Sequence, residues 1–216
     1  MKNIVVLISG RGSNLAALLQ TAQSERWSNT LDAAIVAVVS NRDDAPGLEL
    51  ARRAGIATAV VDHRAFATRQ EFDRALAAEV DRHEPALVLL AGFMRVLTPE
   101  FVRHYEGRLI NIHPSLLPLF PGLKTHQRAL DAGVRVHGAT VHYVSDQVDS
   151  GGIIAQAVVP VLPGDDAQTL AIRVLAQEHR LLPRALRLVL EQRVRWSGGQ
   201  VAVHDVAGAD LALLSP

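Results

Sequence analysis

The chain has 216 residues, 49% of them hydrophobic, and its 22 basic residues equal its 22 acidic residues. This length suits one sizeable core and is short for two full domains, and the neutral balance lacks the basic excess typical of proteins that bind nucleic acid. Because the sequence contains no cysteine, disulfides and thiolate metal sites are excluded.

The first ten residues, MKNIVVLISG, form a short apolar run that ends in glycine. They lack the h-region and cleavage site of a signal peptide. No apolar stretch of the sequence approaches the roughly 20 residues that a membrane-spanning helix needs. We therefore expect a soluble cytoplasmic protein with no membrane partner.

Short β-branched runs alternate with amphipathic segments over the first half of the chain. The runs predict five strands, at 3–9, 33–40, 57–61, 86–92 and 108–113. The segments between them predict helices at 14–22, 45–55 and 68–85, the last capped by Thr68. Strands this apolar are covered on both faces, as in parallel sheets. The alternation predicts an α/β fold with a doubly wound, mostly parallel central sheet.

The second half has a different character, which begins with a proline-rich loop at 115–127. Two antiparallel strands are predicted at 136–144 and 153–161, followed by a long helix at 165–192 that we expect to be kinked near Pro183. One or two short strands are predicted in the tail, for example at 200–206. This part predicts a small antiparallel C-terminal extension of the sheet.

The segment SGRGSN, residues 9–14, is a glycine-rich turn between the first strand and the first helix. Small residues let backbone N–H groups approach an anion at a helix N-terminus. Leu15 stands where the dinucleotide fingerprint needs a third glycine, and there is no Walker A lysine. The turn therefore predicts a single phosphate site, or else an ordinary turn capped by Ser13 or Asn14.

Asn111 and His113 lie two positions apart at the end of an apolar strand that Pro114 stops. Residues at this spacing share one face of a strand, and the carboxyl ends of strands are where open α/β sheets build sites. Asp149 offers a carboxylate in the glycine-rich segment DQVDSGG. A carboxylate can orient an imidazole and favour its protonated form. The alternatives are that His113 is a buried histidine with a structural role and that Asp149 is an ordinary turn residue.

Metal binding and serine catalysis are less well supported. His137 and His142 are five apart in one predicted strand, which places them on opposite faces. The sequence has no HExxH pattern and no G-x-S-x-G elbow. We expect neither a metal nor a serine nucleophile.

Five motifs occur in the order and spacing of a known family: ISGRGSNL, AGFMRVLTP, LINIHPSLLPLFPGLKTHQRAL, HGATVH and VDSGGIIAQ. Together they closely resemble the folate-dependent phosphoribosylglycinamide formyltransferases, from residue 2 to about residue 190. The resemblance implies one formyltransferase domain over 1–216. Within it we expect a nucleotide-binding half (1–110), a folate-binding and catalytic half (111–195) and a tail (196–216).

The resemblance also implies the reaction, in which 10-formyltetrahydrofolate gives its formyl group to the amine of glycinamide ribonucleotide. Carried over by motif, the catalytic residues are Asn111, His113 and Asp149. The substrate would bind to Gly12, Ser13, Asn14 and Glu178. The folate would bind to Arg69, Met94, Arg95, Val96, Leu97 and Asn111, near the loop at 145–149.

The residue chemistry agrees with this reaction. Attack of an amine on a formyl carbon creates an oxyanion, and preorganised donors such as Asn111 and a protonated His113 are worth ~3 kcal/mol each.

Two related enzymes are the alternatives. Methionyl-tRNA formyltransferase would have a further C-terminal domain and a basic surface, and formyltetrahydrofolate hydrolase would have a regulatory domain before the catalytic one. We expect neither, and we expect a monomer or weak homodimer whose partners are the two small substrates.

Overall fold

The computed structural model describes residues 1–197 and 200–214. It divides into two compact units, Met1–Ile110 and Asn111–Pro216. The division falls inside strand β5 (Leu109–His113), so that one strand ends the first unit and begins the second. The expected single-domain organisation stays a prediction.

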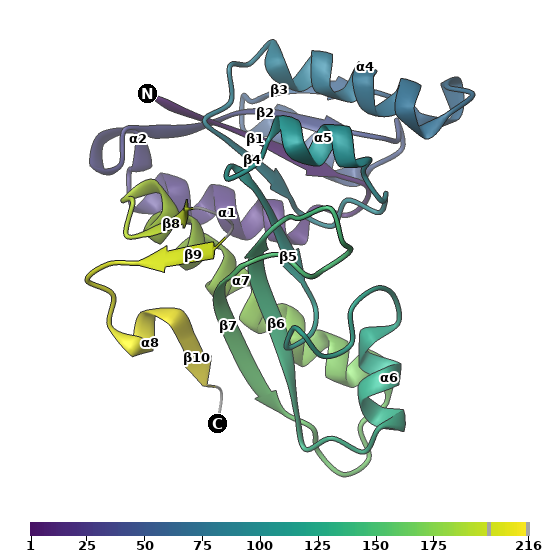
Figure 1. The fold of residues 1–216 in the computed structure, drawn as a ribbon, viewed down its shortest axis with the longest axis vertical. Helices are drawn as coiled ribbons and strands as arrows, with labels where there is room; N and C mark the ends of the chain where they lie inside the picture. Colours follow the sequence, from purple (N-terminus) through teal and green to yellow (C-terminus); the bar gives the residue numbers. More distant parts are fainter. Residues whose placement is uncertain (198–199, 215–216) are drawn as a thin grey trace. The chain divides into compact units, whose positions relative to one another are not determined.

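Four parallel strands form the centre of the first unit, in the order β4-β1-β2-β3 (Figure 1). Their bounds are β1 Lys2–Ile8, β2 Ala33–Ser40, β3 Ala57–Val60 and β4 Leu87–Leu90. The central strand β1 is fully buried from Ile4 to Ile8, because it has a strand on each side and helices on both faces. Since the four strands are parallel, their carboxyl ends lie at one edge of the sheet.

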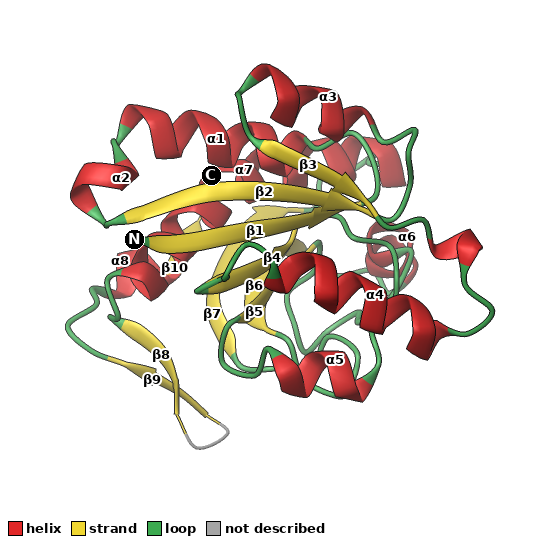
Figure 2. Cartoon of the chain, turned by 90° about the horizontal axis from the view of Figure 1, so that it is seen from above, coloured by secondary structure: helices red, strands yellow, loops and turns green. Residues whose placement is uncertain are grey.

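The helices of the first unit cover both faces of these strands. Figure 2 shows α1 and α3 over one face and α4 and α5 over the other, which is the doubly wound arrangement predicted. Thr68 caps α4 as expected, in a capping box with Glu71. The elements are α1 Ser13–Ser24, α2 Trp27–Thr30, α3 Pro46–Arg53, the 3₁₀ turn η1 His63–Ala65, α4 Arg69–Asp81 and α5 Pro99–His104.

The second unit is built on an antiparallel pair. Strands β6 (Val136–Tyr143) and β7 (Ile153–Pro160) pair antiparallel, and β10 (Ala212–Leu214) adds parallel to β7. Helix α7 (Ala167–Leu190) packs on β6 and β7 (Figure 1). The remaining elements are α6 Thr125–Asp131, the antiparallel hairpin β8 Val194–Ser197 and β9 Gln200–Val203, and α8 Gly208–Leu211.

The predicted α/β class is confirmed, with a mostly parallel sheet of eight strands and a separate antiparallel pair. Every predicted strand and long helix is present, whereas the short helices α5 and α6 were not predicted. Helix α6 begins after Lys124, which has a φ of 56° and no side-chain cap, so its start has no signal in the sequence. Helix α7 runs through Pro183, and the kink there stays a prediction. No helix of the described ranges has the length and apolar character to cross a membrane.

Candidate active site

Asn111 and His113 occupy the end of β5, where apolar and polar positions alternate. Ile110 and Ile112 are buried, as is His113, whereas Asn111 is half-buried. The alternation lets the isoleucines contribute to the core while the two polar side chains point to the same face of the strand. This is the placement that the sequence predicted.

Asp149 meets His113 from the loop between β6 and β7. Its Oδ2 atom lies 3.3 Å from His113 Nδ1. On the other side of the ring, His113 Nε2 lies 3.1 Å from the carbonyl oxygen of Phe120. Both ring nitrogens therefore face an acceptor, which satisfies the two N–H groups of a protonated imidazole. The structure brings together all three residues predicted to be catalytic.

His142, at the end of β6, is a fourth member of this cluster that sequence reasoning missed. Its Nε2 atom lies 3.2 Å from Asn111 Nδ2 and 3.9 Å from Asp149 Oδ1. Its Nδ1 atom lies 2.9 Å from the Tyr143 carbonyl, which only an N–H can satisfy. Burial lowers the pKa of His142, so the neutral ring is favoured. Nδ1 then donates to Tyr143, and Nε2 accepts from Asn111.

The bond from Asn111 to His142 has a consequence for the Asn111 amide. It fixes which end of the amide is nitrogen, and one N–H and the carbonyl oxygen are left for other partners. A sequence signal for His142 did exist. It lies near the end of the predicted strand at 136–144, which leads into the DQVDSGG segment.

The proline-rich loop contacts the same residues through its backbone. Asp149 Oδ2 accepts the Gly122 N–H at 2.7 Å, and the Phe120 carbonyl contacts His113 as described. The cluster can thus offer an amide N–H and an imidazolium N–H to developing negative charge.

The glycine-rich turn of the first unit has no side-chain cap. Gly12 is the N-cap of α1, with φ 74° and ψ 30°, and makes no side-chain cap hydrogen bond. The expected cap at Ser13 or Asn14 is therefore wrong, because the N-cap is Gly12, whereas the phosphate site stays a prediction. A Cβ atom on Gly12 would lie 2.9 Å from the Cα atom of Gly47 in α3. Glycine is needed here both for the left-handed backbone and for this close approach.

The residues expected to bind folate in the first unit lie near one another. Arg69 is the first residue of α4. Arg95 lies over the ring of Phe72, 5.6 Å from its centre. Both arginines are near the buried carboxyl of Asp73, which accepts the Thr98 N–H at 2.5 Å. Burial raises the pKa of Asp73. Met94 and Val96 expose 71% and 54% of their surface, which is unusual for apolar side chains and suits contact with a ligand.

The remaining expectations concern Glu178 and metal binding. Glu178 lies in α7 and is 7% exposed. His137 contacts the rings of Phe120 and His126, whereas His142 contacts Asn111, so the two histidines have different partners. In the part of the chain that the structure describes, no three His, Asp or Glu side chains are grouped to hold a metal ion. That the protein needs no metal stays a prediction.

Comparison with protein families finds one that covers most of the chain. The family described as "Formyl transferase" matches residues 2–186. The Escherichia coli protein named phosphoribosylglycinamide formyltransferase is 48% identical over 204 residues, which span 92% of this chain and 94% of that protein. The Gallus gallus trifunctional purine biosynthetic protein adenosine-3 is 48% identical over 192 residues, 89% of this chain but 19% of that longer protein.

Solved structures give the same result. The phosphoribosylglycinamide formyltransferase of Coxiella burnetii is 44% identical, with a TM-score of 0.88 over 100% of this chain and 99% of that one. A formyltetrahydrofolate deformylase from Pseudomonas syringae is 32% identical, with a TM-score of 0.84 over 94% of this chain and 66% of that one.

Proposed function

The chain belongs to the formyl transferase family, and we propose that it is a phosphoribosylglycinamide formyltransferase of de novo purine biosynthesis. It would transfer the formyl group of 10-formyltetrahydrofolate to the amine of glycinamide ribonucleotide. The observation that carries this proposal is the cluster of Asn111, His113, His142 and Asp149. It supplies the donors that formyl transfer requires, and a covalent nucleophile is not needed when the folate brings an activated formyl group.

We propose that Asn111 and His113 stabilise the oxyanion that forms when the amine attacks the formyl carbon. The free N–H of the Asn111 amide is one donor, and the N–H on His113 Nε2 is the other, once the substrate oxygen replaces the carbonyl of Phe120. Donors of this type are worth about 3 kcal/mol each when they are held in place before the reaction. His142 holds the first donor through Asn111, and Asp149 holds the second through His113 Nδ1.

The proton balance assigns a further role to Asp149. The attacking amine becomes positively charged and must lose one proton, while N10 of the folate must gain one as its bond to the formyl carbon breaks. Asp149 is the carboxylate of the cluster, and we propose that it assists the first transfer through water. His113 keeps its two N–H groups through the step, since it acts as a donor and not as a base.

The binding residues are proposed from the family motifs. The phosphate would bind to the backbone N–H groups of Gly12, Ser13 and Asn14 at the start of α1, where the helix dipole favours an anion. Glu178 would contact the ribose. Arg69 and Arg95 supply positive charge that fits the carboxylates of a folate, and the exposed Met94, Val96 and neighbouring Leu97 fit its apolar parts. The cytoplasmic location and the monomer or weak homodimer stay predictions.

The test is an assay with a panel of acceptors. The full chain is incubated with 10-formyltetrahydrofolate and either glycinamide ribonucleotide, free glycinamide or formyl-acceptor initiator tRNA, in a buffer that contains EDTA. We expect rapid formylation of glycinamide ribonucleotide only, since the other acceptors lack the ribose phosphate or the small reacting amine.

Three outcomes would contradict the proposal. Formylation of the tRNA, or release of formate at the same rate without any amine, would assign a different activity to the chain. Activity that is lost in EDTA and restored by zinc would show that a metal is required.

A further inference from the structure

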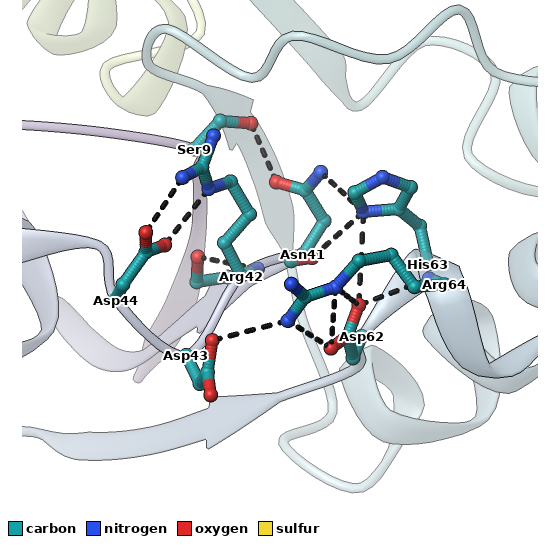
Figure 3. A network of polar contacts seen from close by, with 9 residues as sticks. Ser9, Asn41, Arg42, Asp43, Asp44, Asp62, His63 and Arg64 are labelled. Atoms are coloured by element: carbon teal, nitrogen blue, oxygen red, sulfur yellow. Dashed lines mark hydrogen bonds and ion pairs between the residues drawn. The ribbon is translucent and has the colours of Figure 1, made fainter.

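A chain of hydrogen bonds connects the segments that follow all four strands of the first unit. Figure 3 shows its part from Ser9 through Asn41 to His63. Ser9 follows β1, Asn41 follows β2, His63 begins the turn after β3, and Met94 lies in the turn after β4. The Ser9 hydroxyl donates to Asn41 Oδ1 at 2.6 Å and accepts the Met94 N–H at 2.8 Å. Asn41 in turn contacts His63, with 3.2 Å between Asn41 Nδ2 and His63 Nδ1.

The buried hydrogen bonds of this network constrain its geometry more than the exposed ion pairs do. Ser9 is 9% exposed and Asn41 is 2% exposed, so the bonds between them are shielded from water. The ion pairs drawn beside them, Arg42 with Asp44 and Arg64 with Asp62, lie at the surface, where such pairs contribute little. The part that can fix geometry is therefore Ser9 with its two partners.

Ser9 is unusual because it bonds the turn after β4 twice. Its backbone N–H donates to the Gly92 carbonyl at 3.2 Å, and its hydroxyl accepts from the Met94 N–H. A hydroxyl has only one hydrogen. Because the Ser9 hydroxyl donates this hydrogen to Asn41, its oxygen is oriented to accept the Met94 N–H. One residue further along, the Gly10 carbonyl accepts the Gly47 N–H at 3.1 Å. Ser9 thus lies between the turn proposed for phosphate and the segment proposed for folate.

We propose that Ser9 is a positioning residue for the folate substrate. Its hydroxyl, oriented by Asn41, holds the Met94 N–H and thereby the backbone of residues 92–97 in the shape that the folate contacts. The inference rests on the proposed function, which assigns residues 94–97 to folate. It adds a residue that does not itself touch either substrate.

The test compares Ser9→Ala with wild-type protein. Removing the hydroxyl leaves the Met94 N–H without its partner and frees the turn, so the KM for 10-formyltetrahydrofolate should rise about tenfold. The KM for glycinamide ribonucleotide and kcat should change less than about twofold, because the chemistry is assigned to the second unit. Ser9→Thr keeps the hydroxyl and should restore the folate KM. A purely structural role would lower the active fraction and leave both KM values unchanged.

Ser40→Ala is the matched control. Ser40 is also a fully buried serine at the end of a strand, but its hydroxyl accepts the Arg42 N–H and takes no part in the chain through Met94. The folate KM of this variant should stay within about twofold of wild type. An equal rise in Ser40→Ala, or no rise in Ser9→Ala, would overturn the role of Ser9.

Direct titration separates this inference from the proposed function. The dissociation constant of 10-formyl-5,8-dideazafolate, a stable analogue, is measured by calorimetry for wild type and Ser9→Ala. A tenfold weaker constant supports the inference, and equal constants overturn it. Wild-type protein that binds the analogue but transfers no formyl group would overturn the proposed function, and the two constants would still decide on Ser9. A wild type that does not bind the analogue would overturn both.

Discussion

At the scale of single residues, the cluster depends on which atom donates to which. His142 is neutral and accepts from Asn111, while His113 faces the carboxylate of Asp149 and a backbone carbonyl. We propose opposite roles for the two histidines: His142 orients a donor, and His113 is a donor. For His142 the proposal rests on burial, which lowers its pKa, and for both rings on the neighbours of each ring nitrogen.

The role of Asp149 is tested by Asp149→Asn. The amide keeps the size of the side chain and an oxygen that can still accept the Gly122 N–H, but it removes the charge that faces His113. We expect kcat to fall at least about 100-fold, with the KM values nearly unchanged. Asp149→Ala serves as the comparison, since it removes the bond to Gly122 as well. If Asn supports near-normal turnover and Ala does not, then Asp149 only orders the loop.

The sequence predicts part of this cluster for a clear reason. Asn111 and His113 are found by the two-residue period of a strand, and Asp149 by its glycine-rich loop. The contact of the Phe120 carbonyl with His113 could not be found, because a backbone atom has no residue type to recognise. His142 was missed because its partners come from two other segments.

At the scale of elements, the turn between β1 and α1 shows how packing shapes the proposed phosphate site. Gly12 and Gly47 bring the turn and the start of α3 into contact, and neither has room for a side chain. The capping position that Ser or Asn usually fills is taken by Gly12, which has no side chain to cap the helix. The close packing of the turn on α3 and the choice of glycine at the N-cap thus have the same cause.

Gly12→Val tests this element. Valine would have to adopt a φ of 74° and would meet Gly47, so the turn must move. We expect the KM for glycinamide ribonucleotide to rise at least about tenfold, because backbone N–H groups lose their alignment with the phosphate. The KM for the folate should change little. Gly10→Ala is the control in the same turn, since a Cβ atom there meets nothing within 4 Å. A rise in the folate KM alone would assign the turn to the other substrate.

Elements were predictable where a pattern and a boundary signal coincide. Helix α4 has both an apolar period and the Thr68 cap, and β2 was predicted at its observed bounds, Ala33–Ser40. Helices α5 and α6 have six and seven residues, too few for a period to be visible. Helix α5 does have a start signal, the Thr98 cap followed by Pro99, whereas α6 has no side-chain cap.

At the scale of the whole molecule, the net charge is zero, and we expect buried histidines to lower the stability of the fold as the pH falls. His137 is 1% exposed, and burial, with the neighbouring His126, lowers its pKa to about 4. The unfolded chain, with a histidine pKa near 6.5, binds this proton first as the pH falls. Stability from the neutral ring is therefore present above pH 6.5 and is lost progressively toward pH 4, by up to about 3 kcal/mol.

His137→Phe tests this dependence. An aromatic ring that can pack against Phe120 is kept, but no proton can bind. We expect the free energy of unfolding of the variant to fall less steeply between pH 6.5 and 4 than that of wild type. Urea titrations at several pH values measure both curves. Curves that run parallel over this range would show that His137 does not titrate differently in the folded protein.

The two units carry different parts of the proposed function. The residues assigned to phosphate, with Arg69 and residues 94–97 for folate, lie in the first unit, and those assigned to the chemistry lie in the second. Variants in the first unit should therefore change KM values, and variants in the cluster should change kcat. This separation makes the catalytic claim testable on its own.

The central claim is that Asn111 and His113 act mainly in the transition state of formyl transfer. The most direct measurement is the single-turnover rate of formylation of glycinamide ribonucleotide, with both substrates saturating, in Asn111→Ala and His113→Ala beside wild type. We predict that each variant binds both substrates with nearly unchanged dissociation constants and reacts about 100-fold more slowly or worse. A rate within a few-fold of wild type in either variant would contradict the role assigned to that residue.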